Sequence, residues 1–186
     1  AAKGWLVNRI VRNVEADYSI GKSGWYDRAM TVQTSGLLAT RGDAPLGDLC
    51  PMARSLQMIG KRTALLLLRE ALYGATRFDQ FRKRVGITEA AASKRLHDLV
   101  IAGVLEQRPY REPGQRTRNE YVLTPAGHDL MPVVIGLLQW GVEHASEDDS
   151  PVVTHEGCGA EVRAVVRCTA GHDVDESSVR IDAGRA

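Results

Sequence analysis

The chain has 186 residues, of which 44% are hydrophobic and 25% are charged, and its formal net charge at pH 7 is +1. This composition is typical of a globular protein with one main core, and it excludes a wholly disordered chain. The near-neutral average hides a basic segment, because residues 77–118 contain ten Lys and Arg side chains against five Asp and Glu side chains.

Membrane and secreted classes are disfavoured as well. The longest apolar runs, such as Ala64–Leu68, are too short to cross a bilayer, and the N-terminus lacks the pattern of a signal peptide. The three cysteines, Cys50, Cys158 and Cys168, do not form the dense, even-numbered set of a disulfide scaffold. We therefore expect a cytoplasmic protein with no membrane partner.

Residues 1–45 are predicted to be an N-terminal extension of unknown role. A short amphipathic helix is expected near Leu6–Val14, and residues 1–29 are either an upstream extension or a cloning remnant. The segment Gly21–Ser23 matches the end of a phosphate-binding loop, but Ala16 stands where that motif needs another glycine. Nucleotide binding is therefore not predicted.

A regular helical pattern begins at Cys50. Cys50 followed by Pro51 is typical of an N-cap and a first helical turn, and Gly60 is expected to end this helix. A second helix over Thr63–Tyr73 is apolar nearly all round, as expected for a helix that packs on several sides. A brief third helix is predicted to end near Val85-Gly86.

The fourth predicted helix runs from Thr88, which can cap its N-terminus, to about Ala102. Two helices joined by a glycine-containing turn are the pattern of a helix-turn-helix. Apolar residues of the fourth helix recur on one face, which turns a polar and basic face outward. That face carries Ser93, Lys94 and Arg95.

Two extended runs, Val104–Tyr110 and Arg118–Leu123, flank a turn built on Pro113-Gly114 and are predicted to form a β-hairpin wing. A long helix is predicted to follow from Thr124-Pro125, and its apolar surface is broad enough to need a partner. The residues of that dimerisation surface are Leu130, Val133, Val134, Leu137, Leu138 and Trp140. The sequence of residues 46–146 thus predicts a mainly α fold with a small β-hairpin (α+β). This fold is a winged helix-turn-helix with terminal dimerisation helices, which binds DNA and dimerises.

Residues 147–186 are predicted to form an acidic linker and a small β-rich tail, with short strands around Val162–Val166. The pairs His155/Cys158 and Cys168/His172 are of zinc-ligand chemistry. Only nine residues separate the two cysteines, fewer than in common zinc fingers, so structural zinc and simple packing or pairing of the cysteines both stay open. We therefore assign no metal site and no cofactor.

The basic groups lie on two elements that a winged helix uses on DNA. Binding double-stranded DNA requires cations along the phosphates for affinity and a protruding element in the major groove for sequence recognition. The predicted DNA-binding residues are Arg77, Thr88, Ser93, Lys94, Arg95, Arg111, Arg116 and Arg118. The alternatives are a solvated basic surface and a winged-helix protein-interaction module that does not bind DNA.

No catalytic residue is predicted, because the five histidines are scattered and have no nucleophile or paired-carboxylate motif beside them. We therefore do not expect an enzyme. Cys50 lies at a helix start with Arg54 one turn later, and both the helix dipole and a nearby cation favour a thiolate. A redox or electrophile sensor and a buried small apolar side chain are both open interpretations of Cys50.

The region from Cys50 to His144 resembles the HxlR-type winged helix-turn-helix regulators of bacteria, which are MarR-like. The matching segments are, in order, Cys50-Pro51, Ile59–Thr63, Leu67–Glu70, Arg77–Phe81, Ser93–Leu96, Gly103–Leu105, Asn119–Thr124 and Gly127. The resemblance implies a homodimer with paired terminal helices on a palindromic operator, and a cysteine at the position of Cys50 that senses oxidants or electrophiles. We expect a repressor, with an activator as the alternative, and an oxidant or small-molecule effector. It does not cover residues 1–45, and Arg62 departs from it, because the family usually has an aromatic residue there.

Overall fold

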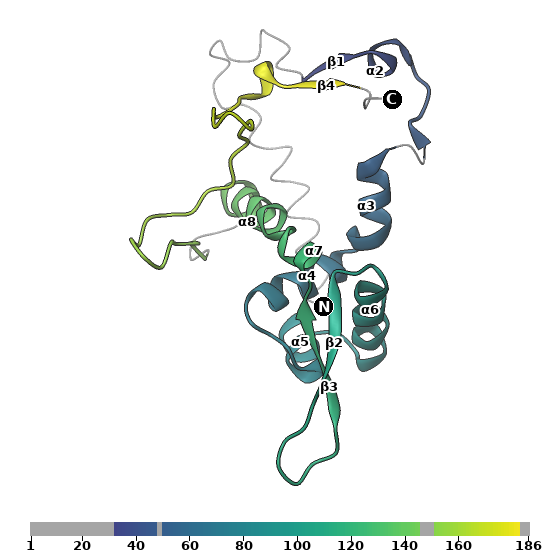
Figure 1. Cartoon of the computed structure of the whole chain (residues 1–186), viewed down its shortest axis with the longest axis vertical. Coiled ribbons are helices and arrows are strands. Elements are labelled where there is room, and N and C mark those ends of the chain that lie inside the picture. Colours follow the sequence, from purple (N-terminus) through teal and green to yellow (C-terminus); the bar gives the residue numbers. More distant parts are fainter. Residues whose placement is uncertain (1–31, 48–49, 146–150, 183–186) are drawn as a thin grey trace, which may run out of the picture. The chain divides into compact units, whose positions relative to one another are not determined.

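The structure is a computed structural model that describes residues 32–47, 50–145 and 151–182 (Figure 1). The helix expected near Leu6–Val14 and the segment Gly21–Ser23 lie outside these described residues.

The described chain divides into two compact units. The larger unit comprises Pro45–Gly141 and Pro151–Ala164, and the smaller unit comprises the described parts of Ala1–Ala44, Val142–Ser150 and Val165–Ala186. None of the helices that the structure describes combines the length and the apolar character that crossing a membrane requires.

The first two helices of the larger unit are α3 (Pro51–Ile59) and α4 (Arg62–Leu72). α3 begins where predicted, since Cys50 has an extended backbone (φ −78°, ψ 111°) and Pro51 occupies the first turn, where a missing N–H costs no helical hydrogen bond. Leu67 and Leu68 of α4 are buried and Leu65 and Leu66 are half-buried, which confirms that this helix packs inside the unit.

The helix-turn-helix is formed by α5 (Phe78–Val85) and α6 (Glu89–Ile101). α5 ends at Gly86, whose left-handed backbone (φ 69°) a residue with a side chain adopts only at a cost. Two residues later the hydroxyl oxygen of Thr88 accepts the N–H of Ala91 at 3.3 Å, which caps the start of α6. The predicted turn and the predicted cap are both confirmed.

The wing is an antiparallel pair, β2 (Leu105–Tyr110) and β3 (Arg118–Leu123). The last residue of β2, Tyr110, lies opposite the first residue of β3, Arg118. The loop that joins them contains Gly114 with a positive φ of 77°, as expected for a turn built on Pro-Gly. Figure 1 shows this hairpin extending beyond the helices of the unit.

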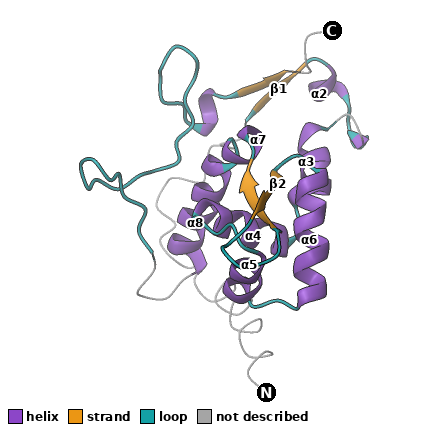
Figure 2. Ribbon diagram, turned by 60° about the horizontal axis from the view of Figure 1, so that its bottom comes forward, coloured by secondary structure: helices purple, strands orange, loops and turns teal. Residues whose placement is uncertain are grey.

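The core of the larger unit lies between α4, α5, α6 and the base of the hairpin (Figure 2). The largest fully buried side chains are Phe81, Leu67, Leu68, Leu96, Leu99 and Leu105. Burial of each such side chain contributes about 1.5–3 kcal/mol. The hairpin is hydrogen-bonded to the segment just before α5, because the backbone N–H of Tyr121 donates to the carbonyl oxygen of Thr76 at 2.8 Å.

The long helix predicted from Thr124 is interrupted, and that part of the prediction is wrong. The structure has a short α7 (Pro125–His128), capped by Thr124, and a separate α8 (Met131–Ala145). The physical reason is Pro132, which lacks an N–H to donate to the last carbonyl of α7 and is tolerated only in the first turn of a new helix.

Gly127 of α7 packs so closely that a side chain does not fit. A Cβ atom there would overlap the backbone carbonyl oxygen of Val104 and lie 2.9 Å from the Leu123 side chain. We expect Gly127→Ala to lower the free energy of unfolding by about 1–3 kcal/mol in urea titrations, because the backbone cannot move aside cheaply.

Gly141 of α8 is the matched control for this prediction, since a Cβ there meets no described atom within 4 Å. Gly141→Ala is expected to raise the unfolding free energy by about 0.5–1 kcal/mol through helix propensity. Equal stability of Gly127→Ala and the unaltered protein would contradict the close packing.

The smaller unit contains a parallel pair of short strands, β1 (Gln33–Ser35) and β4 (Arg180–Asp182), with α2 (Leu37–Thr40) and the 3-10 turn η2 (Glu176–Ser178) beside them in sequence. The side chains of the first residues of the two strands are hydrogen-bonded at 3.3 Å. No local pattern in the sequence predicts this pairing, which joins the two ends of the described chain.

The strands predicted around Val162–Val166 are wrong. In the described part of the tail, pairing outside β4 is limited to isolated bridges, Thr154 with Glu161 and Arg167 with Asp173. A short apolar run becomes a strand only where a neighbouring strand and a buried face are available.

Candidate nucleic-acid interface

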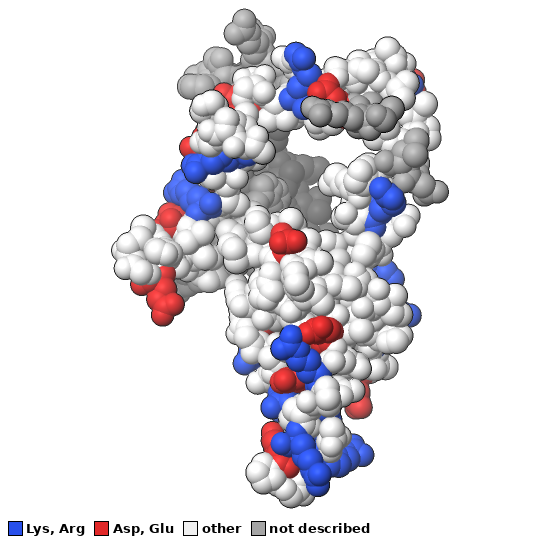
Figure 3. Space-filling view, viewed as in Figure 1, with Lys and Arg blue, Asp and Glu red and all other residues white. Residues whose placement is uncertain are grey.

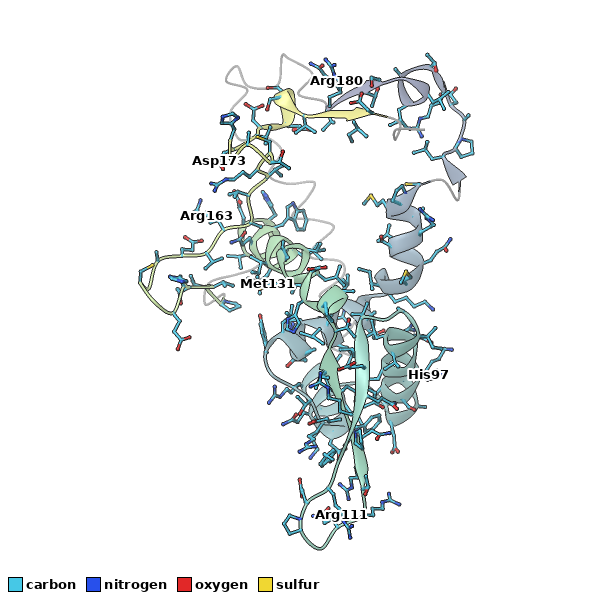
Figure 4. All side chains as sticks on the ribbon, viewed as in Figure 1. His97, Arg111, Met131, Arg163, Asp173 and Arg180 are labelled. Carbon is cyan, nitrogen blue, oxygen red and sulfur yellow. The ribbon has the colours of Figure 1, made fainter. Side chains whose placement is uncertain are left out.

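α6 turns one face inward and one outward. Leu96 and Leu99 are fully buried, whereas Ser93 and Lys94 are exposed, as the helical period predicts. No hydrogen bond or ion pair joins the Lys94 ammonium to another described residue, so its full charge faces solvent. His97, four positions after Ser93, continues this outward ridge and points away from the hairpin (Figure 4). His97 is not among the predicted DNA-binding residues. The spacing of four residues from Ser93, which places both side chains on one face of a helix, would have identified it.

The N-terminus of α6 has a mixed character. Thr88 is exposed, and its hydroxyl oxygen is already used to cap the helix, which leaves the hydroxyl hydrogen to donate to an anion. The next residue, Glu89, places a negative charge in the first turn and offsets the positive end of the helix dipole. Thr88 is therefore suited to a single hydrogen bond with a phosphate.

Arg95 is placed differently from its neighbour Lys94. One of its terminal nitrogens, Nη1, lies 2.7 Å from the Oδ2 atom of Asp98, and only 15% of the Arg95 side chain is exposed. Its Nε atom is buried and has no hydrogen-bond partner among the described residues. Arg95 is therefore paired with a residue of its own helix and does not belong to the outward ridge of Ser93, Lys94 and His97.

The far end of the hairpin carries exposed arginines (Figure 3). The side chains of Arg116 and Arg118 make no hydrogen bond or ion pair with any other residue that the structure describes. Arg111, also at this end in Figure 4, donates from Nε to the carbonyl oxygen of Gln115 at 3.1 Å, which closes the turn. The remaining guanidinium nitrogens of Arg111 stay exposed together with Arg116 and Arg118.

Several other cations of the basic segment lie beside a carboxylate within the larger unit, although Arg84 shares the Glu70 carboxylate with Arg69, which is 2.7 Å away. Arg82 lies 3.6 Å from Asp79, Arg84 lies 3.8 Å from the buried Glu70, and Arg108 pairs with Glu106. The local charge surplus is thereby concentrated in a few exposed groups. These are Lys83, Lys94, Arg111, Arg116 and Arg118.

A ladder of polar side chains along the hairpin, on the face whose base carries Leu105 and Leu123, was not predicted. The Asn119 amide donates to the side-chain oxygen of Gln107 at 3.3 Å, and the Gln107 amide donates to the Tyr121 hydroxyl at 3.5 Å. These residues share one face of the two strands through the alternation of a β-hairpin. Exposed amides of this kind can donate to phosphates or to base edges.

The charged end of Arg77 is turned toward the hairpin, and 34% of its side chain is exposed. Its guanidinium carbon lies 3.1 Å from the centre of the Tyr110 ring, and its Nη1 atom lies 3.4 Å from Glu120 Oε2. The same Nη1 atom is buried and has no hydrogen-bond partner among the described residues. Arg77 therefore differs from the other arginines predicted to bind DNA, because its guanidinium faces the two strands of the hairpin.

The predicted dimerisation residues divide into two sets. Val134 is buried in the core, Leu130 packs against that core, and Leu138 is half-buried. Val133, Leu137 and Trp140 are exposed by 46%, 50% and 61%. The outward set forms an apolar stripe on α8, as the predicted partner surface requires.

The tail covers a different edge of α8. Within the larger unit, the side-chain amide of Gln139 donates to the carbonyl oxygen of Val162 and accepts the backbone N–H of Ala164, the latter at 2.9 Å. A Cβ atom on Gly136 would lie 3.7 Å from the Ala164 Cβ. The chain's own tail thus lies beside Gly136 and Gln139 and leaves the stripe at Leu137 exposed.

Cys50 is a half-buried free thiol at the start of α3. Its carbonyl oxygen accepts the backbone N–H of Arg54 at 3.2 Å, which makes Cys50 the first acceptor of the helix. The Arg54 side chain is exposed and forms no ion pair with a described residue. The thiol is therefore at the predicted position, next to the positive end of a helix.

The four predicted tail ligands form two close pairs. His155 Nδ1 lies 3.2 Å from Cys158 Sγ, and Cys168 Sγ lies 3.6 Å from His172 Nδ1. Backbone N–H groups of His172 and Ala170 lower the pKa of the Cys168 thiol. Among the described residues, no group of three or more His, Cys, Asp or Glu side chains is placed to hold a metal ion. Structural zinc and simple packing or pairing of the cysteines stay the two alternatives, and metal analysis of the purified protein distinguishes them.

Comparison with known proteins matches residues 58–149 to the model of the family described as HxlR-like helix-turn-helix. The chain is 35% identical over 136 residues to the HTH-type transcriptional regulator Rv3095 of Mycobacterium tuberculosis, and this match covers 72% of the chain and 85% of that protein. It is 31% identical to the HTH-type transcriptional regulator YdeP of Bacillus subtilis, over 54% of the chain and 77% of that protein.

Two solved structures are similar as well. The crystal structure of PA1607, described as a candidate transcription factor, superposes with a TM-score of 0.63 at 31% identity, over 73% of this chain and 96% of that chain. The structure of PA1374 from Pseudomonas aeruginosa, described in the same way, gives a TM-score of 0.53 at 33% identity, over 74% and 94% of the two chains. The protein therefore belongs to the HxlR-like helix-turn-helix family and has a winged-helix fold.

Proposed function

We propose that this helix-turn-helix transcriptional regulator binds a palindromic DNA operator as a homodimer and represses transcription. The observation that carries the proposal is the distribution of exposed charge in the larger unit. Lys94 on α6 and the pair Arg116 and Arg118 on the hairpin keep their charges unpaired among the described residues, while other cations of the segment lie beside carboxylates. The names of the curated relatives support the same assignment.

The binding mode follows from the two elements that carry these charges. α6 enters the major groove, where Ser93 and Lys94 meet base edges and Thr88 meets a phosphate. The tip of the hairpin, with Arg111, Arg116 and Arg118, lies along the adjacent backbone or in the minor groove. In a dimer the two α6 helices are about 34 Å apart, which is one turn of DNA.

The experiment that tests this function is recovery and sequencing of genomic DNA fragments with the purified protein, followed by fluorescence anisotropy of an enriched fragment across salt concentrations. Enrichment of a palindrome supports the proposal. Arg116→Ala is expected to weaken binding and to reduce the slope of log K against log salt by about 1 per protomer. If no fragment is enriched and the charge reversals Lys94→Glu and Arg116→Glu change nothing, a protein-interaction module replaces the DNA-binding function.

The homodimer is proposed to form through the outward stripe of α8, with residues Val133, Leu137 and Trp140. An apolar stripe of this kind is stabilised by removal from water, and a two-fold axis allows the same stripe to serve both protomers. The close lateral contact of the tail with Gln139 leaves this stripe accessible.

We further propose that Cys50 makes the regulator responsive to oxidants or electrophiles. Treatment with diamide is expected to lower operator affinity at least about tenfold in the unaltered protein, because modification at the start of α3 disturbs a helix of the same unit. Cys50→Ser is expected to keep full binding under the same treatment, as measured by anisotropy.

The double variant Cys158→Ser/Cys168→Ser is the matched control, since both of those thiols are exposed and outside α3. It is expected to respond to diamide like the unaltered protein. Sensitivity that persists in Cys50→Ser would assign the response to another group.

A further inference from the structure

Arg77 occupies the junction between the helix-turn-helix and the wing. It is the N-cap residue of α5, and its backbone N–H donates to the Gln80 side-chain oxygen at 3.0 Å, as does the N–H of Thr76. Its carbonyl oxygen accepts the N–H of Phe81 at 3.2 Å. The backbone of Arg77 is thereby fixed at the start of α5, and its side chain extends from a rigid base.

The side chain of Arg77 contacts both strands of the wing. The guanidinium stacks on Tyr110, the last residue of β2, with 3.1 Å between the guanidinium carbon and the ring centre. It also lies 3.4 Å from the Glu120 carboxylate, which belongs to β3. One planar cation therefore connects the start of α5 to each strand of the hairpin.

This connection lies beside a second one. The N–H of Tyr121, next to Glu120, donates to the carbonyl oxygen of Thr76, next to Arg77. The Tyr121 ring also meets Phe81 edge to face, with ring centres 6.2 Å apart. Thr76 and Arg77 thus contact Tyr121 and Glu120 of β3, the first pair through the backbone and the second through side chains.

The wing depends on such contacts for its direction. An isolated two-stranded hairpin is at best marginally stable in water, so its orientation is set by what it packs against. Tyr110 is the last residue before the loop, and the proposed phosphate contacts Arg116 and Arg118 lie in and just after that loop. Tyr110 lies directly opposite Arg118 and precedes the loop that carries Arg116, so a rotation of the hairpin at the Arg77 contact moves both arginines.

We propose that Arg77 is a positioning residue that sets the direction of the wing, so that Arg116 and Arg118 reach DNA while α6 lies in the groove. Arg77 does not itself contact DNA. Its charge is held by Glu120 and the Tyr110 ring, and one of its nitrogens is buried. This assignment rests on the proposed function and deepens it.

A double-mutant cycle between Arg77 and the tip of the wing tests the proposal. Affinity for the enriched operator is measured by anisotropy for Arg77→Met, for Arg116→Ala/Arg118→Ala, and for all three changes together. Arg77→Met alone is expected to weaken binding about 3- to 100-fold, the range of coupling between interacting residues. In the protein that already lacks the two wing arginines, the same change is expected to weaken binding less than about twofold.

Two further variants separate positioning from charge. Arg77→Lys keeps the charge but not the planar stack, and Tyr110→Leu removes the ring without touching a charge. Both are expected to lose affinity as Arg77→Met does, whereas Arg82→Met, which breaks an exposed pair with Asp79 on the same helix, is expected to keep it. Unaltered thermal unfolding of Arg77→Lys or Tyr110→Leu shows that the fold is retained.

Several results would overturn the positioning role. One is a loss of affinity in Arg77→Met that adds in full to the loss of affinity in Arg116→Ala/Arg118→Ala. A further drop of about 1 in the slope of log K against log salt would accompany it, as for a direct phosphate contact. Another is normal binding by Arg77→Lys or Tyr110→Leu. Hydrogen exchange at the Tyr121 amide, expected to rise at least about tenfold in Arg77→Met, is independent of DNA. Failure of the unaltered protein to bind any operator would instead reject the proposed function.

Discussion

Lys94→Ala is expected to abolish preference for the operator while leaving the fold intact. Lys94 lies on the outward face of α6 and has no partner among the described residues, so its loss removes a contact with DNA and none within the unit. A side chain that reads a base contributes about 1–3 kcal/mol, and a dimer loses two copies, which amounts to about 2–6 kcal/mol or about 30- to 20,000-fold in affinity. Anisotropy on operator and scrambled duplexes measures the ratio of the two affinities.

Lys61→Ala is the matched control, because it removes the same charge from an exposed position outside α6 and the hairpin. It is expected to keep the ratio of specific to non-specific affinity. If Lys94→Ala lowers both affinities equally, Lys94 contacts a phosphate and α6 reads sequence through other residues, of which Ser93 and His97 are next on the same ridge.

Arg95→Ala is expected to behave unlike Lys94→Ala. Because Arg95 is largely buried and paired with Asp98, its removal leaves a carboxylate without its partner and lowers the free energy of unfolding. Adjacent basic residues on one helix thus have different expected roles, and only the structure distinguishes them.

The second large effect is expected for Leu137→Asp. Leu137 is 50% exposed on the apolar stripe of α8, so a carboxylate there leaves the folded protomer undisturbed but is costly to bury between two protomers. Sedimentation velocity is expected to show a monomer. Operator affinity is expected to fall at least about 100-fold, because linked binding of two half-sites is lost.

Val152→Asp is the control for this change, since Val152 is an exposed apolar residue of the tail, 67% accessible, in the same unit. It is expected to leave the dimer intact. A dimer that persists in Leu137→Asp would place the two-fold contact on another surface, and the exposed Met52 and Leu56 of α3 would be the next to change.

Local chemistry made most of the winged helix predictable. Gly86 and Thr88 mark the turn and the cap within three residues of each other, and the 3.6-residue period orients α6 without reference to anything else. The turn built on Pro-Gly fixed the hairpin in the same way, and the predicted run Arg118–Leu123 has the observed bounds of β3.

The interruption between α7 and α8 was also readable in principle. Pro132 cannot continue a helix from Pro125, and the apolar periodicity of the segment concealed that signal. The parallel pairing of β1 with β4 was not readable, because each strand has three residues and the two are separated by nearly the whole described chain. Pairing over such a separation has no local signature.

The sequence by itself determined that the chain is a winged helix-turn-helix with a basic segment, because capping, periodicity and turn chemistry act over a few neighbouring residues. Only the tertiary structure decided which cations of that segment face solvent. Lys94, Arg116 and Arg118 remain open, whereas Arg77 and Arg95 are held by Glu120 and Asp98. A long cationic side chain takes its direction from whichever carboxylate or ring the fold brings within reach, and sequence spacing does not encode that direction.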